Sequence, residues 1–134
     1  MLELEILEIE KQTLNKLRWD TQIDQVPFEI YIPKWRVPKP WPRKIYVDIQ
    51  ALKTPSVSAS RLLEADVRNN PSLAERKIIA YVKSYKEKEH TLRYQPVGDK
   101  STWEIGEPYI PYPLTQNCAQ ILKITIHWEK PANF

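Results

Sequence analysis

The chain has 134 residues, of which 42% are hydrophobic and 28% charged, and its formal net charge is +3. We expect one globular domain, residues 1–134, because a chain of this length buries about two-thirds of its unfolded surface. The weak positive charge does not by itself predict nucleic-acid binding, and no apolar run approaches the ~18 residues of a membrane helix.

The counts of cysteine and glycine exclude further classes of protein. Cys118 is the only cysteine, so no intrachain disulfide can form, which favours a reducing compartment. The N-terminus, MLELEILEIEK, lacks the basic end and apolar run of a signal peptide, and we therefore expect a cytoplasmic protein. The only glycines are Gly98 and Gly106, too few for a phosphate-cradling loop or a dinucleotide fingerprint.

Residues 2–10, LELEILEIE, are predicted to form a strand, because Leu2, Leu4 and Ile6 alternate with glutamates. Apolar residues then continue on the other face from Leu7, so a strand here needs a bulge or two buried faces. A helix is the alternative, but nothing before Leu2 could cap it.

A proline-rich segment separates the next two predicted strands. Residues 11–27 are polar with scattered apolar anchors, which indicates a loop or hairpin return. Residues 28–32, FEIYI, and 44–50, KIYVDIQ, alternate apolar and polar side chains as strands do. Between them, residues 33–42 should run extended, close to polyproline II, because proline lacks the N–H of a ladder and restricts the residue before it.

The middle of the chain is predicted to be helical. Residues 60–69 fit a short helix that ends before Pro71, and Ser72 and Glu75 have the spacing of a capping box for a second helix. The competing interpretation makes residues 77–85 a strand, because apolar side chains also alternate there. The inward positions of the first helix would be Leu62, Leu63 and Val67.

The last third of the chain predicts further strands. Residues 90–96 and 101–105 indicate a hairpin, and residues 107–113, EPYIPYP, form a second extended segment rich in proline and tyrosine. Residues 120–129, QILKITIHWE, are the clearest strand of all, with Leu122, Ile124 and Ile126 on one face.

These elements predict an α+β fold. We expect a mainly antiparallel sheet of about five strands, with one or two helices from residues 60–86 packed on one face. The alternative is an all-β sandwich or barrel, which is favoured if residues 77–85 form a strand.

The chemically reactive residues do not form a recognisable catalytic or metal-binding pattern. His90 and His127 are far apart in sequence, and no spacing of histidine, cysteine or carboxylate matches a known metal site. A lone thiol such as Cys118 is usually a small buried side chain. The sequence therefore predicts no catalytic residue, no metal and no cofactor, and a protein that is not an enzyme.

Residues 28–48 contain the strongest functional signal. Cations and aromatic side chains alternate there around four prolines, and an extended backbone would hold them out of the fold. Tryptophan, tyrosine and arginine anchor protein interfaces, and the second proline-aromatic segment is similar in kind. The predicted binding residues are Lys34, Trp35, Arg36, Lys39, Trp41, Arg43, Lys44, Tyr109 and Tyr112.

Three interpretations of this segment remain open. We expect a non-enzymatic binding or assembly subunit that engages a larger protein partner, with no membrane and no small-molecule substrate. The same cations and aromatic rings could instead contact nucleic acid, alone or in a nucleoprotein complex. The structural alternative lays Trp35 and Trp41 on the core and leaves the cations at its rim, where Glu3–Glu10 would neutralise them.

Overall fold

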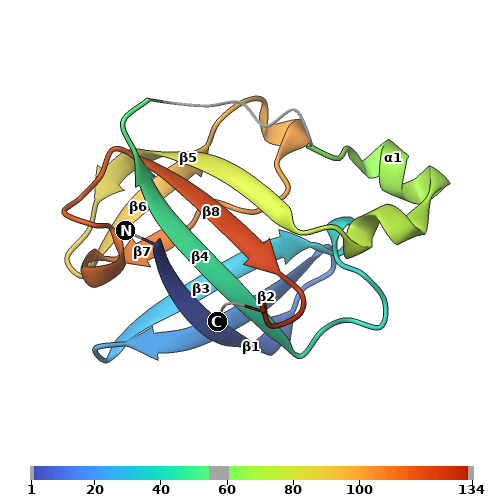
Figure 1. The fold of residues 1–134 in the computed structure, drawn as a ribbon, viewed down its shortest axis with the longest axis horizontal. Coiled ribbons are helices and arrows are strands. Elements are labelled where there is room, and N and C mark those ends of the chain that lie inside the picture. Colours follow the sequence, from blue (N-terminus) through green and yellow to red (C-terminus); the bar gives the residue numbers. More distant parts are fainter. Residues whose placement is uncertain (1, 55–60, 133–134) are drawn as a thin grey trace.

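The computed structural model describes residues 2–54 and 61–132, and for residues 2–8 and 10–12 it describes the backbone alone. In this part of the chain, eight antiparallel strands close into a barrel in the order β1-β2-β3-β7-β6-β5-β8-β4 (Figure 1). The strands are β1 (Leu2–Gln12), β2 (Lys16–Ile23), β3 (Val26–Pro33), β4 (Lys44–Leu52), β5 (Ile78–Glu87), β6 (Thr91–Pro96), β7 (Tyr109–Pro111) and β8 (Ile121–His127).

The predicted α+β fold with about five strands is therefore wrong, and the barrel alternative is correct. The decisive segment is residues 77–85, which were expected to continue the helices and instead form most of β5. Ile78 and Val82 are fully buried there. β5 pairs with β8 on one side and β6 on the other, so hydrogen bonding to two neighbours overrides a helical spacing of apolar residues.

The barrel combines hairpin connections with strands that return to pair with distant ones, such as β8, which lies between β5 and β4. β1, β2 and β3 form a meander, and β4 comes back to pair with β1. The β2–β3 turn is tight because Asp24 and Gln25 both adopt positive φ, at 50° and 69°, as a two-residue hairpin requires. The expected bulge in β1 is present as a register shift between Ile9 and Lys11.

β2 is a strand in a region predicted to be a loop or hairpin return. Leu17 and Trp19 point into the barrel and are fully buried, and the Trp19 indole N–H donates to the carbonyl of Pro42 at 3.0 Å. Of the other residues of β2, only the half-buried Ile23 packs against the core, so the apolar alternation is too weak to recognise from sequence.

The core fills the barrel interior, because buried and partly exposed side chains alternate along β3, β4 and β8. The strands predicted at residues 28–32 and 44–50 are confirmed as parts of β3 and β4, and the strand predicted at 120–129 is confirmed over Ile121–His127 as β8. The fully buried residues of these three strands include Phe28, Ile32, Ile45, Val47, Ile49, Leu122, Ile124 and Ile126.

Between β4 and β5 the chain leaves the barrel. Residues 61–77 contain α1 (Glu64–Asn69) and the 3-10 turn η2 (Pro71–Glu75), which project at the right of Figure 1. The helix is shorter than predicted, its expected start at Ser60 lies outside the described residues, and Leu63 is 45% exposed rather than inward. The predicted capping box is absent, because η2 has no side-chain cap.

Two other predicted segments differ from the structure. Residues 101–105 form no strand, because the 3-10 turn η3 (Lys100–Thr102) follows β6 and the partner of β6 is instead β7. Residues 34–36 form the 3-10 turn η1 (Lys34–Arg36) rather than polyproline II. The 107–113 segment is extended only over β7 and then turns through η4 (Tyr112–Leu114). Within the described ranges, no helix is long and apolar enough to cross a membrane.

Candidate binding groove

A groove of about 550 Å³ lies between the connection from η1 to β4 and residues 61–77. Residues 61–77, which contain α1 and η2, are called the excursion. The volume of the groove is within the range of pockets that bind ligands. One wall comes from residues 34–41 and the other from residues 67–75, so the groove joins two segments that are distant in sequence. Its apolar lining consists of Trp35, Val37, Pro38, Trp41, Val67, Pro71 and Ala74.

The two tryptophans of the groove are both half-buried. Trp35 packs against a small cluster formed by Leu62, Val67 and Ala74 beneath the excursion. Trp41 packs against the main core of the barrel. Each indole therefore packs against a hydrophobic cluster and also lines the groove.

Three cationic side chains, those of Lys34, Lys39 and Arg68, also line the groove. The Lys34 ammonium lies 5.4 Å from the centroid of the Trp41 ring, within cation–π distance. Lys39 is exposed, and its peptide bond to Pro40 is cis. Arg68 forms an ion pair with Glu64 one helical turn earlier. Among the described lining residues, these three cations face a single carboxylate, that of Glu75.

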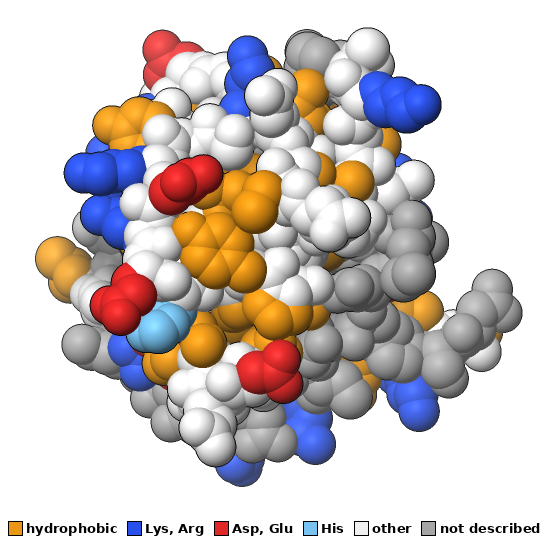
Figure 2. All heavy atoms as spheres, turned by 90° about the vertical axis from the view of Figure 1, so that its left-hand side faces the viewer, with side chains coloured by type: hydrophobic (Ala, Val, Ile, Leu, Met, Phe, Trp, Pro, Cys, Tyr) orange, Lys and Arg blue, Asp and Glu red, His pale blue; other side chains and the backbone are white. Residues whose placement is uncertain are grey.

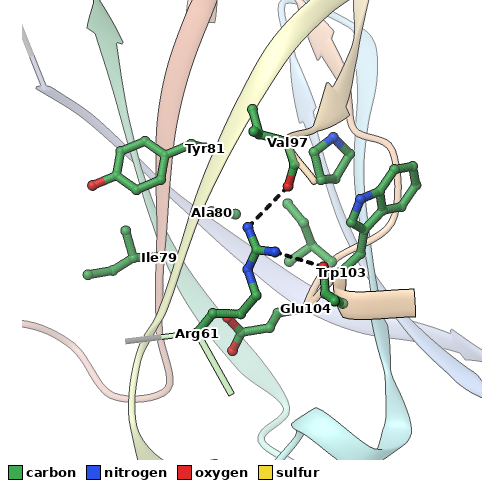
Figure 3. A pocket seen from close by; sticks show the side chains of 10 residues that line it. Arg61, Ile79, Ala80, Tyr81, Val97, Trp103 and Glu104 are labelled. Carbon is green, nitrogen blue, oxygen red and sulfur yellow. Dashed lines mark hydrogen bonds between the residues drawn. The ribbon is translucent and has the colours of Figure 1, made fainter. Parts of the chain in front are cut away.

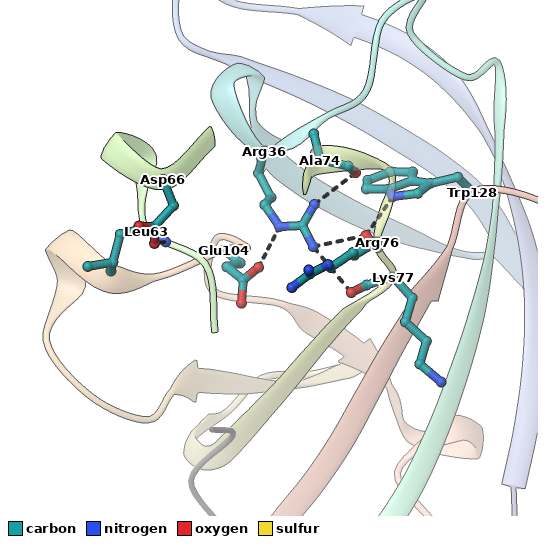
Figure 4. A network of polar contacts seen from close by, with 8 residues as sticks. All are labelled: Arg36, Leu63, Asp66, Ala74, Arg76, Lys77, Glu104 and Trp128. Atoms are coloured by element: carbon teal, nitrogen blue, oxygen red, sulfur yellow. Dashed lines mark hydrogen bonds and ion pairs between the residues drawn. The ribbon is translucent and has the colours of Figure 1, made fainter. Parts of the chain in front are cut away.

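Arg36 is buried beneath the groove and does not face it. Its side chain is 1% exposed, and its Nε donates to Glu104 at 2.5 Å. The Arg36 Nη1 donates to the carbonyl of Ala74, and Nη2 donates to the carbonyls of Arg76 and Lys77 (Figure 4). One guanidinium thus ties η1 on the first wall to η2 and the start of β5 on the second.

Burial raises the pKa of the Glu104 carboxyl, because removing water from it penalises the charged form. Hydrogen bonding and charge from Arg36 act in the opposite direction, as does a hydrogen bond from the backbone N–H of Leu62. Desolvation is the larger effect. Glu104 therefore links Arg36 of η1 to Leu62 near the start of residues 61–77.

A second anchor holds the start of the excursion. The Arg61 guanidinium donates to the Thr102 hydroxyl at 2.7 Å and to the carbonyl of Val97 at 3.1 Å. The Arg61 side chain lines a small cavity of about 20 Å³ (Figure 3). Gly98 is required beside it, because φ there is +101° and a Cβ would lie 2.8 Å from the Arg61 Nη1 atom.

The structure brings together four of the predicted binding residues, Lys34, Trp35, Lys39 and Trp41, along one wall of the groove. Arg36 is internal, so it cannot contact a partner.

Two further predicted residues lie beyond that wall. Arg43 and Lys44 are exposed but do not line the groove. Lys44 opens β4, where the backbone register places it opposite Glu8 of the acidic N-terminal strand; the Glu8 side chain is outside the described part of the chain.

Tyr109 begins β7 and Tyr112 begins η4, and neither residue lines the groove. Tyr109 pairs with Glu29 in the middle of β3, five residues before η1 begins at Lys34, or about 17 Å along an extended strand. Its exposed ring lies 5.3 Å from the Arg93 guanidinium, which also contacts the Tyr85 ring at 5.0 Å. Figure 2 shows the end of the barrel at the left of Figure 1, where hydrophobic side chains gather among charged ones.

The second wall of the groove was not predicted from sequence. Val67, Arg68 and Pro71 appeared to belong to an ordinary amphipathic helix and its terminus. Nothing in their local pattern indicates that they face residues 34–41, because the contact depends on the buried Arg36 guanidinium. An arginine between a tryptophan and a valine gives no sequence signal of burial.

The histidines and the cysteine lie apart. His127 Nε2 is 2.7 Å from Asp48 Oδ2 on the outside of the barrel, His90 is exposed, and Cys118 is an exposed free thiol. The described residues contain no group of three or more histidine, cysteine or acidic side chains that could hold a metal ion.

No protein-family model matches this sequence, and no curated protein is similar to it.

Proposed function

We propose that this chain is a non-enzymatic binding or assembly subunit whose groove receives a segment of a larger protein partner. The observation that carries the proposal is the pair of half-buried tryptophans, Trp35 and Trp41, along one preformed groove of about 550 Å³. Tryptophan is among the residues that contribute most to protein interfaces, above all when it lies in a well-packed pocket.

The fixed walls of the groove support the same proposal. Arg36 joins both walls through three carbonyl contacts, and Arg61 fastens the start of the excursion. A site that is already ordered loses less conformational freedom when a partner binds, and more of the contact energy is then available as affinity.

Affinity capture from the organism that encodes the chain tests the proposal. The wild-type protein and the variants Trp35→Ala and Trp41→Ala would be used with and without nuclease, and the captured protein identified, purified and titrated. We expect each variant to weaken its binding at least tenfold. Tyr85→Ala is the matched control, because Tyr85 is an exposed aromatic residue at a distance from the groove.

Salt dependence separates a protein partner from nucleic acid. Binding to phosphates weakens linearly in the logarithm of salt concentration, with a slope set by the number of phosphates neutralised. An interface anchored by tryptophan should depend on salt much less. A steep slope combined with loss of capture after nuclease treatment would replace the proposal with nucleic-acid binding, and equal binding by both tryptophan variants would refute a role for the groove.

A further inference from the structure

Resting on the function proposed above, we infer that the groove binds an extended, proline-rich segment of the partner that carries carboxylates. The shape of the lining, the state of Trp41 and the charge of the rim each favour this class of ligand.

The lining favours proline rings. Trp35 and Trp41 provide aromatic surfaces, and Pro38 and Pro71 line the two opposite walls. Aromatic-lined grooves bind proline-rich segments, because a polyproline II helix is already ordered before it binds and fits its rings between aromatic side chains.

The size of the groove favours an extended chain over a helix. One turn of helix is 10–12 Å wide and 5.4 Å long, so it fills about 400–600 Å³, the whole of a groove of about 550 Å³. A helix bound in a groove uses anchors at positions i, i+3, i+4 and i+7, which span two turns. An extended segment instead spaces its contacts at about 3.1 Å per residue and can continue out of both ends.

Trp41 has an unused hydrogen-bond donor. Its Nε1 atom is buried and has no acceptor among the described residues, an unfavourable state for a polar group. The carbonyls of a polyproline II segment have no internal partners and can accept from this N–H. The Lys34 side chain now lies over the same ring, and a bound segment would displace it.

The rim determines the preferred charge of the ligand. Lys34, Lys39 and Arg68 outnumber Glu75 among the described lining residues. Arg68 is already paired with Glu64, which leaves the two lysines as the cations nearest the tryptophan wall. When a bound segment displaces the Lys34 ammonium from the Trp41 ring, a carboxylate of the ligand can pair with that ammonium. This ion pair replaces the lost cation–π contact.

Nuclear magnetic resonance of the full chain tests the inference with three synthetic nine-residue peptides. The probe repeats Pro-Pro-Glu, the charge control repeats Pro-Pro-Lys, and the conformational control repeats Gly-Ser-Glu. The indole N–H signals of the tryptophans are assigned with single Trp→Phe variants. We expect the Pro-Pro-Glu peptide to shift Trp35 and Trp41, to move the Trp41 N–H signal downfield, and to leave Trp103 unchanged.

We expect the paired variant Lys34→Glu/Lys39→Glu to weaken this peptide at least tenfold without changing the circular dichroism spectrum. Equal binding of the Gly-Ser-Glu peptide would overturn the requirement for proline, and equal binding of the Pro-Pro-Lys peptide would overturn the requirement for carboxylates. If no peptide shifts the groove signals while the native partner still requires Trp35, the inference fails and the proposed function stands. If the native partner does not require Trp35 or Trp41 either, both fail.

Discussion

Arg36 and Glu104 form a buried ion pair across 68 positions of sequence, with the Nε of Arg36 2.5 Å from an oxygen of Glu104. Removing one partner leaves the other charge buried without compensation. We expect Arg36→Met to lower the free energy of unfolding by about 3–5 kcal/mol, measured by urea denaturation.

A double-mutant cycle provides the control for that prediction. Arg36→Met/Glu104→Met removes both charges, so it should cost clearly less than the sum of the two single variants. Some cost remains, because the carbonyls of Ala74, Arg76 and Lys77 lose their donor. Additive single losses, or a loss below about 1 kcal/mol for Arg36→Met, would show that the pair does not hold the two walls.

The raised pKa of Glu104 predicts a specific dependence of stability on pH. A carboxyl whose pKa is higher in the folded than in the unfolded state binds its proton more tightly when folded. Its contribution to stability is then fully present below the unfolded value, about 4.3 for glutamate, and is lost as the pH rises through the folded pKa.

Glu104→Gln makes that dependence measurable, because it removes the titrating group and keeps its shape. We expect the unfolding free energy of the wild type, minus that of the variant, to fall as the pH rises from below about 4.3 toward neutrality. A difference that rises over the same range would mean that Arg36 lowers the pKa of Glu104 more than burial raises it.

We expect charge reversal at the exposed cations near the groove to leave the fold intact, whereas charge reversal at the buried Arg36 should disrupt it. Lys39 and Arg43 are both exposed. The variant Lys39→Glu/Arg43→Glu should therefore keep the melting temperature within a few degrees of wild type while binding the partner more weakly. Adding Arg36→Glu should unfold the protein, because it places a second buried carboxylate beside Glu104 in place of the Arg36 cation. Thermal denaturation of the two- and three-site variants, alongside wild type, checks both statements; a folded three-site variant would contradict them.

Strong, long alternation made the strands β3, β4 and β8 predictable from sequence. β2 and β5 were harder for different reasons. β2 shows its pattern through only two fully buried apolar residues, Leu17 and Trp19. In β5 the apolar residues satisfy helical and strand spacing at once, and pairing with β6 and β8 decides the outcome. Barrel closure depends on such long-range pairing, which no local pattern encodes.

The candidate site was predictable in part. Alternating cations and aromatic residues marked one wall of the groove, since prolines kept that segment out of the sheet. The same pattern could not separate Arg36 from Lys34, because burial of a guanidinium depends on acceptors from residues 74–77 and on Glu104. It also could not bring Tyr109 near the groove or reveal the second wall.

Ile124 and Ile126 test the barrel core. Both are fully buried in β8, between β4 and β5, as the alternation predicted. We expect each alanine variant to lower the unfolding free energy by about 2–5 kcal/mol, through lost burial and the cavity that remains. Thr125→Ala, on the outward face of the same strand, is the control and should cost much less. A loss below about 1 kcal/mol at both isoleucines would contradict their place in the core.

The loop before β8 provides the last prediction. Gln116, Asn117 and Cys118 adopt positive φ in succession, at 55°, 69° and 57°, a conformation that costs roughly 1–2 kcal/mol per residue with a Cβ. The Gln116 side chain holds the loop through the N–H of Ala51 and the carbonyl of Ile49.

Cys118 is the best position to relieve that cost. Its side chain is exposed, and its only described hydrogen bond, from the backbone N–H to the Thr115 hydroxyl, survives replacement by glycine. After the greater freedom of glycine in the unfolded chain is subtracted, Cys118→Gly should raise the unfolding free energy by about 0.5–1 kcal/mol. Gln120→Gly, two residues later and without a positive φ, should instead lower it. Urea denaturation of both variants decides the matter, and a destabilised Cys118→Gly protein would show that the left-handed turn carries no strain that glycine can remove.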